Sequence, residues 1–292
     1  MSSQRVDAAS GEIDKGDVIS VNSNLVPLLT SVVDSQGQAV ADLTLEDFEL
    51  IVEGAPRTIA DLSRSETAVR LVLLFDNSSS LNVTREFEKK AAIRFFQRVL
   101  RPVDQAAIIS ISSTPELVQT LTPDVKRLVN VIEGFGKAKG ATALLDALAQ
   151  AAQYLAPQQQ ARKVIVLVSD GADTVSDLGF EATMRFVQAA NCQVYAVQTG
   201  HSANANLRDL TAERRLEELT SQTGGTMFVP QTNADLDTAF AQISADLAQQ
   251  YVLSFYPPGE ERGGRFHAVA LRIRAQPKLR VRTRKGYYSR KP

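Results

Sequence analysis

The chain has 292 residues, a formal net charge of −1 and a single cysteine, Cys192. The balanced charge gives no electrostatic argument for a nucleic-acid or membrane partner, and a lone cysteine excludes an intrachain disulfide and a cysteine zinc cluster. Hydrophobic residues make up 44% and charged residues 22% of the chain, as in ordinary globular proteins. No apolar run approaches the roughly 20 residues that a membrane-spanning helix needs.

The first part of the chain predicts a flexible lead-in followed by short strands. Residues 1–20 are polar and lack the apolar stretch of a signal peptide. This composition leaves two expectations open, an extracytoplasmic or secreted protein whose signal has been removed and a cytoplasmic protein. Residues 21–67 predict an N-terminal β segment, because short apolar stretches alternate there with turn residues. Its strands are expected at 24–34, 48–53 and 58–63, and its turns at 35–38 and 54–56.

Residues 68–250 alternate apolar runs with amphipathic segments. This alternation predicts a doubly wound α/β domain, with a mostly parallel sheet of about six strands covered by helices on both faces. The runs at 69–75 and 163–168 suit strands that are buried on both faces. Further strands are expected at 105–112, 192–197 and 226–229. Helices are expected at 84–101, 123–132, 142–155, 180–189, 207–222 and 234–249.

Helical spacing in the first of these helices predicts which of its side chains are buried. The apolar residues share one face, and the charged residues of the first turns lie off it. The expected buried residues are Phe87, Ala91, Phe95 and Val99. The residues expected off that face are Arg85, Glu88 and Lys89.

Residues 251–292 return to a strand pattern, with strands expected at 251–256, 267–274 and 279–284. Neither terminal segment is large enough for a core of its own. We therefore expect residues 251–292 to pair with residues 21–67 in one small β-sandwich, with the α/β domain inserted between its halves. Basic residues recur to the end of the chain and alternate with apolar ones, which favours a solvated strand face over a site for nucleic acid or another anionic surface. These residues are Arg272, Arg274, Lys278, Arg280, Arg282, Arg284 and Lys285.

Two of the apolar strands of the central domain run directly into a carboxylate, Asp76 in one case and Asp170 in the other. In an open α/β sheet, ligands bind beyond the carboxyl ends of the strands. If the two strands are adjacent, both carboxylates reach the same crevice, where their charges repel. A bound divalent cation relieves that repulsion. The sequence therefore predicts a cation site at this edge of the sheet.

The residues around these carboxylates favour a hard divalent cation. Asp76, Ser78 and Ser80 alternate along one loop and can direct three oxygen atoms into a single pocket. Thr142 follows a glycine-rich loop and begins a helix, which adds a fourth oxygen. Carboxylate and hydroxyl oxygens suit Mg²⁺, Mn²⁺ or Ca²⁺ rather than zinc. The alternative for Ser78 or Ser80 is an ordinary helix N-cap.

Taken together, Asp76-x-Ser78-x-Ser80, Gly140-x-Thr142 and Ser169-Asp170-Gly171 resemble the metal-ion-dependent adhesion site of von Willebrand factor type A domains. The resemblance covers residues 68–250. It implies that Ser78 and Ser80 bind Mg²⁺ directly, that Thr142 does so directly or through water, and that Asp76 and Asp170 act largely through water. It also implies that an Asp or Glu of a protein partner fills the last coordination position. The residues expected around that open position are Asn77, Ser79, Gly140, Gly171 and Asp173.

Two departures from the family are Ser79, where glycine is common, and Leu81, where methionine is frequent. Neither removes a ligand oxygen. The flanking segments, with Leu43-Thr44 before Glu46-Asp47-Phe48 and with Lys285-Gly286-Tyr287-Tyr288, resemble bacterial proteins related to this family, most of which are exported. We therefore expect a non-enzymatic module that binds a protein partner through a divalent cation, with the oligomeric state left open.

Other functions remain as alternatives. In a scaffold protein, the metal would only stabilise the fold. A hydrolase using Ser78 is disfavoured because no Gly-x-Ser-x-Gly motif surrounds it and neither His201 nor His267 has the spacing of a triad. The glycine-rich segment 134–140 lacks the spacing of a phosphate loop. Cys192 is expected to be a buried small apolar residue, and Asp173 is favoured as a cap of the turn that follows it rather than as a ligand.

Overall fold

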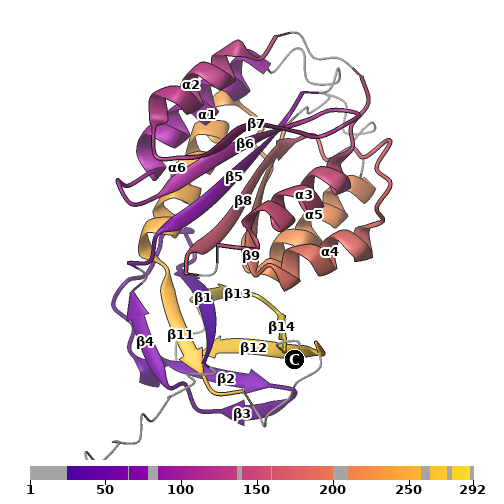
Figure 1. Ribbon diagram of the computed structural model, residues 1–292. Helices are drawn as coiled ribbons and strands as arrows, with labels where there is room; N and C mark the ends of the chain where they lie inside the picture. Colours follow the sequence, from indigo (N-terminus) through magenta and orange to yellow (C-terminus); the bar gives the residue numbers. More distant parts are fainter. Residues whose placement is uncertain are drawn as a thin grey trace, which may run out of the picture.

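The structure is a computed structural model that describes residues 25–64, 66–77, 85–136, 140–158, 160–199, 210–257, 264–274 and 278–289. It contains an α/β domain and a β-sandwich, which lies below that domain in Figure 1. The six-stranded sheet of the α/β domain has the order β10-β9-β8-β5-β6-β7, and only β7 is antiparallel to its neighbour. Its strands are β5 (Val69–Asp76), β6 (Gln105–Ile111), β7 (Glu116–Thr122), β8 (Arg162–Ser169), β9 (Cys192–Gln198) and β10 (Met227–Phe228).

Helices cover both faces of this sheet, as Figure 1 shows. One face carries α1 (Arg85–Val99), α2 (Val125–Gly134) and α6 (Asn233–Gln249). The other carries α3 (Leu144–Leu155), α4 (Phe180–Ala189) and α5 (Leu210–Thr223). Successive strand residues point to opposite faces, so Leu71 and Leu73 join the first core and Val72 and Leu74 join the second. All four side chains are fully buried, and each such burial stabilises the fold by about 1.5–3 kcal/mol.

The β-sandwich consists of two four-stranded sheets, with the orders β13-β1-β11-β4 and β14-β12-β2-β3. In each sheet a strand from the start of the chain pairs with one from its end, β1 with β11 and β2 with β12. The two sheets share one core, to which Leu28, Leu50, Leu253 and Val269 contribute. The strands are β1 (Val26–Val33), β2 (Phe48–Val52), β3 (Ala55–Arg57), β4 (Asp61–Arg64), β11 (Tyr251–Phe255), β12 (Phe266–Ile273), β13 (Arg280–Thr283) and β14 (Gly286–Tyr288), with a short 3-10 helix at Leu45–Asp47. The predicted fold class, an α/β domain inserted in a small sandwich, is confirmed. Within the described residues, no helix is both long and apolar enough to cross a bilayer.

Three strands, β3, β7 and β14, lie where the sequence predicts none, and each is at a sheet edge. The edge strand β7 pairs with β6 through an irregular register, so its apolar residues show no clear alternation. The edge strand β3 occupies part of the predicted turn at 54–56 and contains Pro56. Proline is tolerated on an edge strand because its missing N–H removes no hydrogen bond from the ladder there.

The predicted buried face of α1 is wrong over the first turns of the helix. Phe87 is 47% exposed, whereas Arg85, Glu88 and Lys89 are all buried. The buried stripe continues with Ala92, three residues beyond Lys89. The start of α1 faces polar loops beyond the carboxyl ends of the strands, where charged groups find partners that an apolar core does not offer.

The basic C-terminal strands are solvated only in part. Arg280 and four of the other basic residues are exposed, but Arg282 forms an ion pair with Asp246 of α6 at 3.1 Å. Asp246 also accepts a hydrogen bond of 2.5 Å from the Tyr195 hydroxyl. Burial and this carboxylate raise the pKa of Tyr195 well above its usual value, which keeps the hydroxyl a donor. Arg284 donates to the side-chain oxygen of Asn191 and therefore also contacts the α/β domain.

Arg282→Ala is expected to lower the free energy of unfolding by about 2–4 kcal/mol, because it leaves the Asp246 carboxylate buried without its cation. Urea denaturation followed by circular dichroism measures the change. Arg280→Ala is the matched control, since Arg280 lies in the same strand and is exposed. Equal stability of the two variants would contradict a role for the ion pair at the domain interface.

The Cys192 thiol is 4% exposed, and burial raises its pKa to about 12. We expect Ellman's reagent to label the folded protein at pH 8 at least about a hundredfold more slowly than the urea-unfolded chain, because only the thiolate reacts. The chain has one cysteine, so the change in absorbance measures the labelling of this residue alone. Similar labelling rates in both states would show that the thiol is accessible in the folded protein.

Candidate functional site

The two predicted carboxylates lie at the carboxyl ends of neighbouring parallel strands. β5 and β8 pair in register with Phe75 opposite Val168, so Asp76 ends one strand beside Ser169 at the end of the other. Asp76 is 1% exposed, and its Oδ2 accepts a hydrogen bond of 2.5 Å from the Ser169 hydroxyl. Asp170 follows Ser169 directly. The contact therefore joins the two strand ends at the residues that the metal hypothesis requires.

The turn after β8 holds Asp170 in place. The Oδ1 atom of Asp170 accepts from the Ala172 N–H at 3.0 Å, and its main-chain carbonyl accepts from Gln198 at 3.1 Å. Gly171 has a φ of +86°, and a Cβ there would lie 2.9 Å from Cδ1 of Leu216. This turn therefore requires glycine for two separate reasons. Gly171 is buried against α5.

Thr142 lies in the loop before α3 and is 3% exposed. Its N–H donates to the Thr174 hydroxyl at 2.9 Å, and its carbonyl accepts from the Thr174 N–H at 2.8 Å. These bonds join the Thr142 loop to the segment that follows Asp170. Among the described residues, no hydrogen bond engages the Thr142 hydroxyl itself. That hydroxyl remains available as a ligand oxygen.

The Asp173 carboxylate accepts hydrogen bonds from groups within the α/β domain. Its Oδ1 accepts from the N–H groups of Leu144 and Leu145 at 2.8 and 3.3 Å, and from the Ser176 hydroxyl at 2.5 Å. Asp173 therefore caps the amino end of α3, a helix far earlier in the chain, as well as contacting the turn that follows it. A carboxylate is favourable there because unpaired N–H groups and the helix dipole attract negative charge. This cap fixes the start of α3, two residues after Thr142.

The first turn of α1 holds the other side of the site. Arg85 donates to the side-chain oxygen of Asn77 and to the Gly136 carbonyl, the latter at 3.3 Å. Burial lowers the pKa of Arg85, and the charges of Glu88 and Asp76 oppose that shift. The guanidinium is therefore a fixed positive charge within electrostatic reach of Asp76. Asn77, which was expected to face the partner, uses its side-chain oxygen to hold Arg85.

Lys89, which also lies on α1, contacts the carboxyl end of α2. Its ammonium donates to the main-chain carbonyls of Glu133 and Phe135 at 3.0 and 3.1 Å, at the helix end where carbonyls lack partners within the helix. The Phe135 ring stacks on Phe75 with centroids 5.2 Å apart. Sequence reasoning missed Arg85 and Lys89 as parts of this site. The signal for them was the spacing of Arg85, Lys89 and Ala92, which continue one helical stripe into the core.

The described residues thus place Asp76 and Asp170 at neighbouring strand ends and join the Thr142 loop to the segment that follows Asp170. Ser78, Ser79 and Ser80 lie outside the described residues, as do Leu81 and His201. Gly140 lies at the exposed end of the Thr142 loop with a φ of +88°. No group of three or more His, Cys, Asp or Glu side chains converges in the described part of the chain. Two carboxylates and a hydroxyl are hard oxygen donors, and this donor set fits Mg²⁺.

Comparison with protein families finds a match for part of the chain. Residues 71–172, which run from β5 past Asp170, match the family model of the von Willebrand factor type A domain. The chain contains a von Willebrand factor type A domain. Asp76, Thr142 and Asp170 all lie within the matched residues. No curated protein matches the sequence significantly.

Solved structures share the fold of this von Willebrand factor type A domain. A von Willebrand factor type A protein from Catenulispora acidiphila is 13% identical with a TM-score of 0.54, covering 89% of this chain and 72% of that one. The vWF domain of the type V pili tip protein Mfa5 from Porphyromonas gingivalis is 14% identical with a TM-score of 0.50, covering 61% and 94%. A D319A mutant of the PilB minor pilin from Streptococcus sanguinis is 12% identical with a TM-score of 0.51, covering 63% and 62%.

Asp173→Ala is expected to lower the free energy of unfolding by about 1–2 kcal/mol, because it removes the acceptor for two N–H groups at the start of α3. Asp173→Asn keeps a side-chain oxygen at the same place and should lose less than half as much. Thermal melting of both variants beside the wild type measures the difference. If Asn and Ala are equally destabilising, the carboxylate charge rather than the hydrogen bonds holds the helix end.

Proposed function

We propose that the protein is a non-enzymatic binding module that captures an acidic residue of a protein partner through a bound Mg²⁺, with Mn²⁺ or Ca²⁺ as substitutes. The observation that supports this most is the contact between the ends of β5 and β8, which sets Asp76 and Asp170 at one edge of the sheet. Thr142 adds a hydroxyl that no described residue engages. The sequence motif adds Ser78 and Ser80.

In this proposal the charged and the neutral groups of the site have different roles. A bound Mg²⁺ supplies an open coordination position to which a carboxylate of the partner can bind. Asp76 and Asp170 offset part of the charge of the ion, largely through water, and Ser169 holds the Asp76 carboxylate in place with its hydrogen bond. Neutral hydroxyl ligands leave net positive charge on the ion, which is what attracts an anionic residue. Arg85 adds a second positive charge near Asp76 and favours the same kind of partner.

Hydrogen bonds between the described loops of the site support the binding of a partner. Thr174 ties the Thr142 loop to the turn after β8, and Asp173 ties that turn to α3. A site held in this way pays little ordering entropy when a partner docks, so more of the contact energy appears as affinity. We also propose an extracytoplasmic location, because the flanking strands resemble those of exported bacterial proteins.

Isothermal titration with MgCl₂ tests the ion site. We expect Asp170→Ala and Thr142→Val each to weaken Mg²⁺ binding by about 10–100-fold, since each removes an oxygen near the ion. Thr142→Ser should retain binding because it keeps the hydroxyl. Asp177→Ala is the matched control for Asp170→Ala, since Asp177 is an exposed carboxylate of the same connection between β8 and α4. Absence of Mg²⁺ binding in the wild type would refute the proposal.

A peptide array tests capture of an acidic residue. The array pairs Asp- or Glu-containing peptides with their Asn or Gln counterparts, and it is probed with the protein in Mg²⁺ and in EDTA. We expect a subset of the acidic peptides to bind only in Mg²⁺, and binding to be lost in Asp170→Ala. Thermal stabilisation by Mg²⁺ without any metal-dependent peptide binding would instead favour a scaffold protein in which the ion only stabilises the fold.

A further inference from the structure

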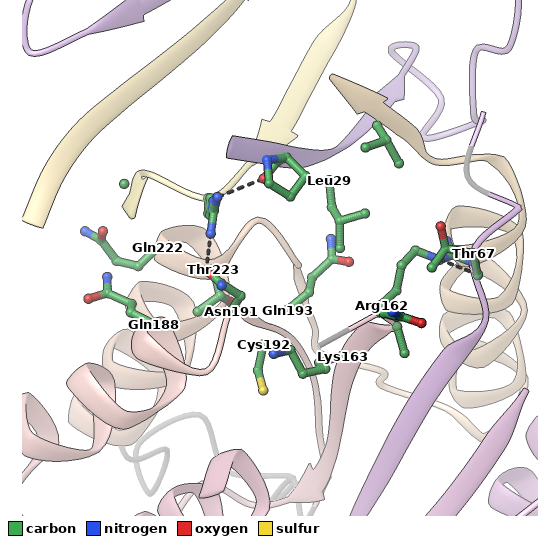
Figure 2. A pocket seen from close by; sticks show the side chains of 16 residues that line it. Leu29, Thr67, Arg162, Lys163, Gln188, Asn191, Cys192, Gln193, Gln222 and Thr223 are labelled. Carbon is green, nitrogen blue, oxygen red and sulfur yellow. Dashed lines mark hydrogen bonds between the residues drawn. The ribbon is translucent and has the colours of Figure 1, made fainter. Parts of the chain in front are cut away.

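A crevice separates the α/β domain from the β-sandwich at the amino end of the parallel sheet (Figure 2). Its volume is about 300 Å³, which is within the range of pockets for small molecules. One wall is formed by the first residues of β8 and β9, including Lys163 and Cys192, and the other by the sandwich strands β1 and β11. Asp170 lies at the opposite end of β8, roughly 23 Å away for a strand of this length. This crevice is therefore separate from the proposed Mg²⁺ site.

The charges that line the crevice all have the same sign. Arg162, Lys163 and Arg284 contribute to its lining, and none of its lining residues is Asp or Glu. Burial lowers the pKa of both arginines to about 10 and lowers that of Lys163 as well. For Lys163 and Arg284, no carboxylate offsets the cost that burial imposes on the charged form.

Arg162 has partners within the protein, but the other two cations are left without a carboxylate. Arg162 donates to the carbonyl of Leu247 at 2.7 Å and to the Gln250 side chain at 3.1 Å. The Lys163 ammonium donates no hydrogen bond within the described residues, and the charge of Arg284 further lowers its pKa. Arg284 donates to two neutral oxygens, one on Asn191 and the carbonyl of Pro27.

The rest of the lining combines amides with an apolar surface. The side chains of Gln188 and Gln222 line the crevice from the α/β domain, as Figure 2 shows, and offer neutral donors and acceptors. Leu29 and Val252 line it from the sandwich. Pockets for small organic ligands commonly have this composition, in which an apolar surface binds the body of the ligand and a few polar groups orient it.

We propose that this crevice binds a small organic anion, with its carboxylate or phosphate group between Lys163 and Arg284 and its apolar body against Leu29 and Val252. The anion supplies the negative charge that the lining lacks, and Lys163 gains a charge-assisted hydrogen bond. Because both domains line the crevice, the ligand contacts both and stabilises their docking. The proposal does not depend on Mg²⁺ binding at the other edge of the sheet.

Isothermal titration with defined probes tests this site, at constant ionic strength set with chloride. The probes are inorganic phosphate, phenyl phosphate and benzoate, and the uncharged control is benzamide. We expect benzoate or phenyl phosphate to bind the wild type, to raise its Tm by about 3 °C near saturation, and to bind Lys163→Gln at least about tenfold more weakly. The probe that binds more tightly distinguishes a carboxylate from a phosphate ligand.

Two further variants keep the test decisive. Lys126→Gln is the matched control, because Lys126 is an exposed lysine on α2 outside the crevice, and it should bind the probes as the wild type does. Arg284→Gln serves as a second charge removal if Lys163→Gln fails to fold. The proposal is overturned if no organic anion binds, if both crevice variants bind like the wild type, or if benzamide binds as tightly as benzoate.

Discussion

The parallel pairing of β5 with β8 is the interaction on which both ends of the α/β domain depend. The register runs without interruption from Val69 opposite Arg162 to Phe75 opposite Val168. At the carboxyl end it brings Asp76 into hydrogen-bond contact with Ser169. At the amino end it places Arg162 and Lys163 against the β-sandwich. A shift of one residue would reverse the faces of a fully buried strand, so the apolar cores on both sides enforce this register.

The sequence predicts this framework well because its strongest signals are local. Strands such as β8, buried along its whole length, require unbroken apolar runs, and the helices on either face require regular apolar spacing. Asp76 and Asp170 were found because each interrupts such a run at its end. The proposed roles of Ser78 and Ser80 rest on their spacing alone, because both lie outside the described residues.

The predictions failed where a polar side chain finds its partner in a distant part of the chain. Arg85 and Lys89 donate to carbonyls 44 to 51 positions away, and the helical spacing that places both residues on the buried stripe does not show which groups accept their hydrogen bonds. Arg282 belongs to a strand whose alternating pattern is typical of a solvated face, but its side chain forms an ion pair with Asp246 of the other domain. Composition tells which groups need partners, but only the tertiary arrangement supplies them.

The insertion of one domain into another also determines the order in which the protein can be completed during synthesis. The sandwich joins segments from the two ends of the chain, and the hydrogen bond from the Leu43 N–H to the Tyr251 hydroxyl spans 208 positions. A ribosome adds about 5–20 residues per second, so β1 to β4 wait roughly 10–40 s for their partner strands. The α/β domain lies between β4 and β11, which pair with each other, so its folding before the sandwich is complete would shorten the loop that the sandwich must close. The topology therefore favours folding of the inserted domain before the sandwich that surrounds it.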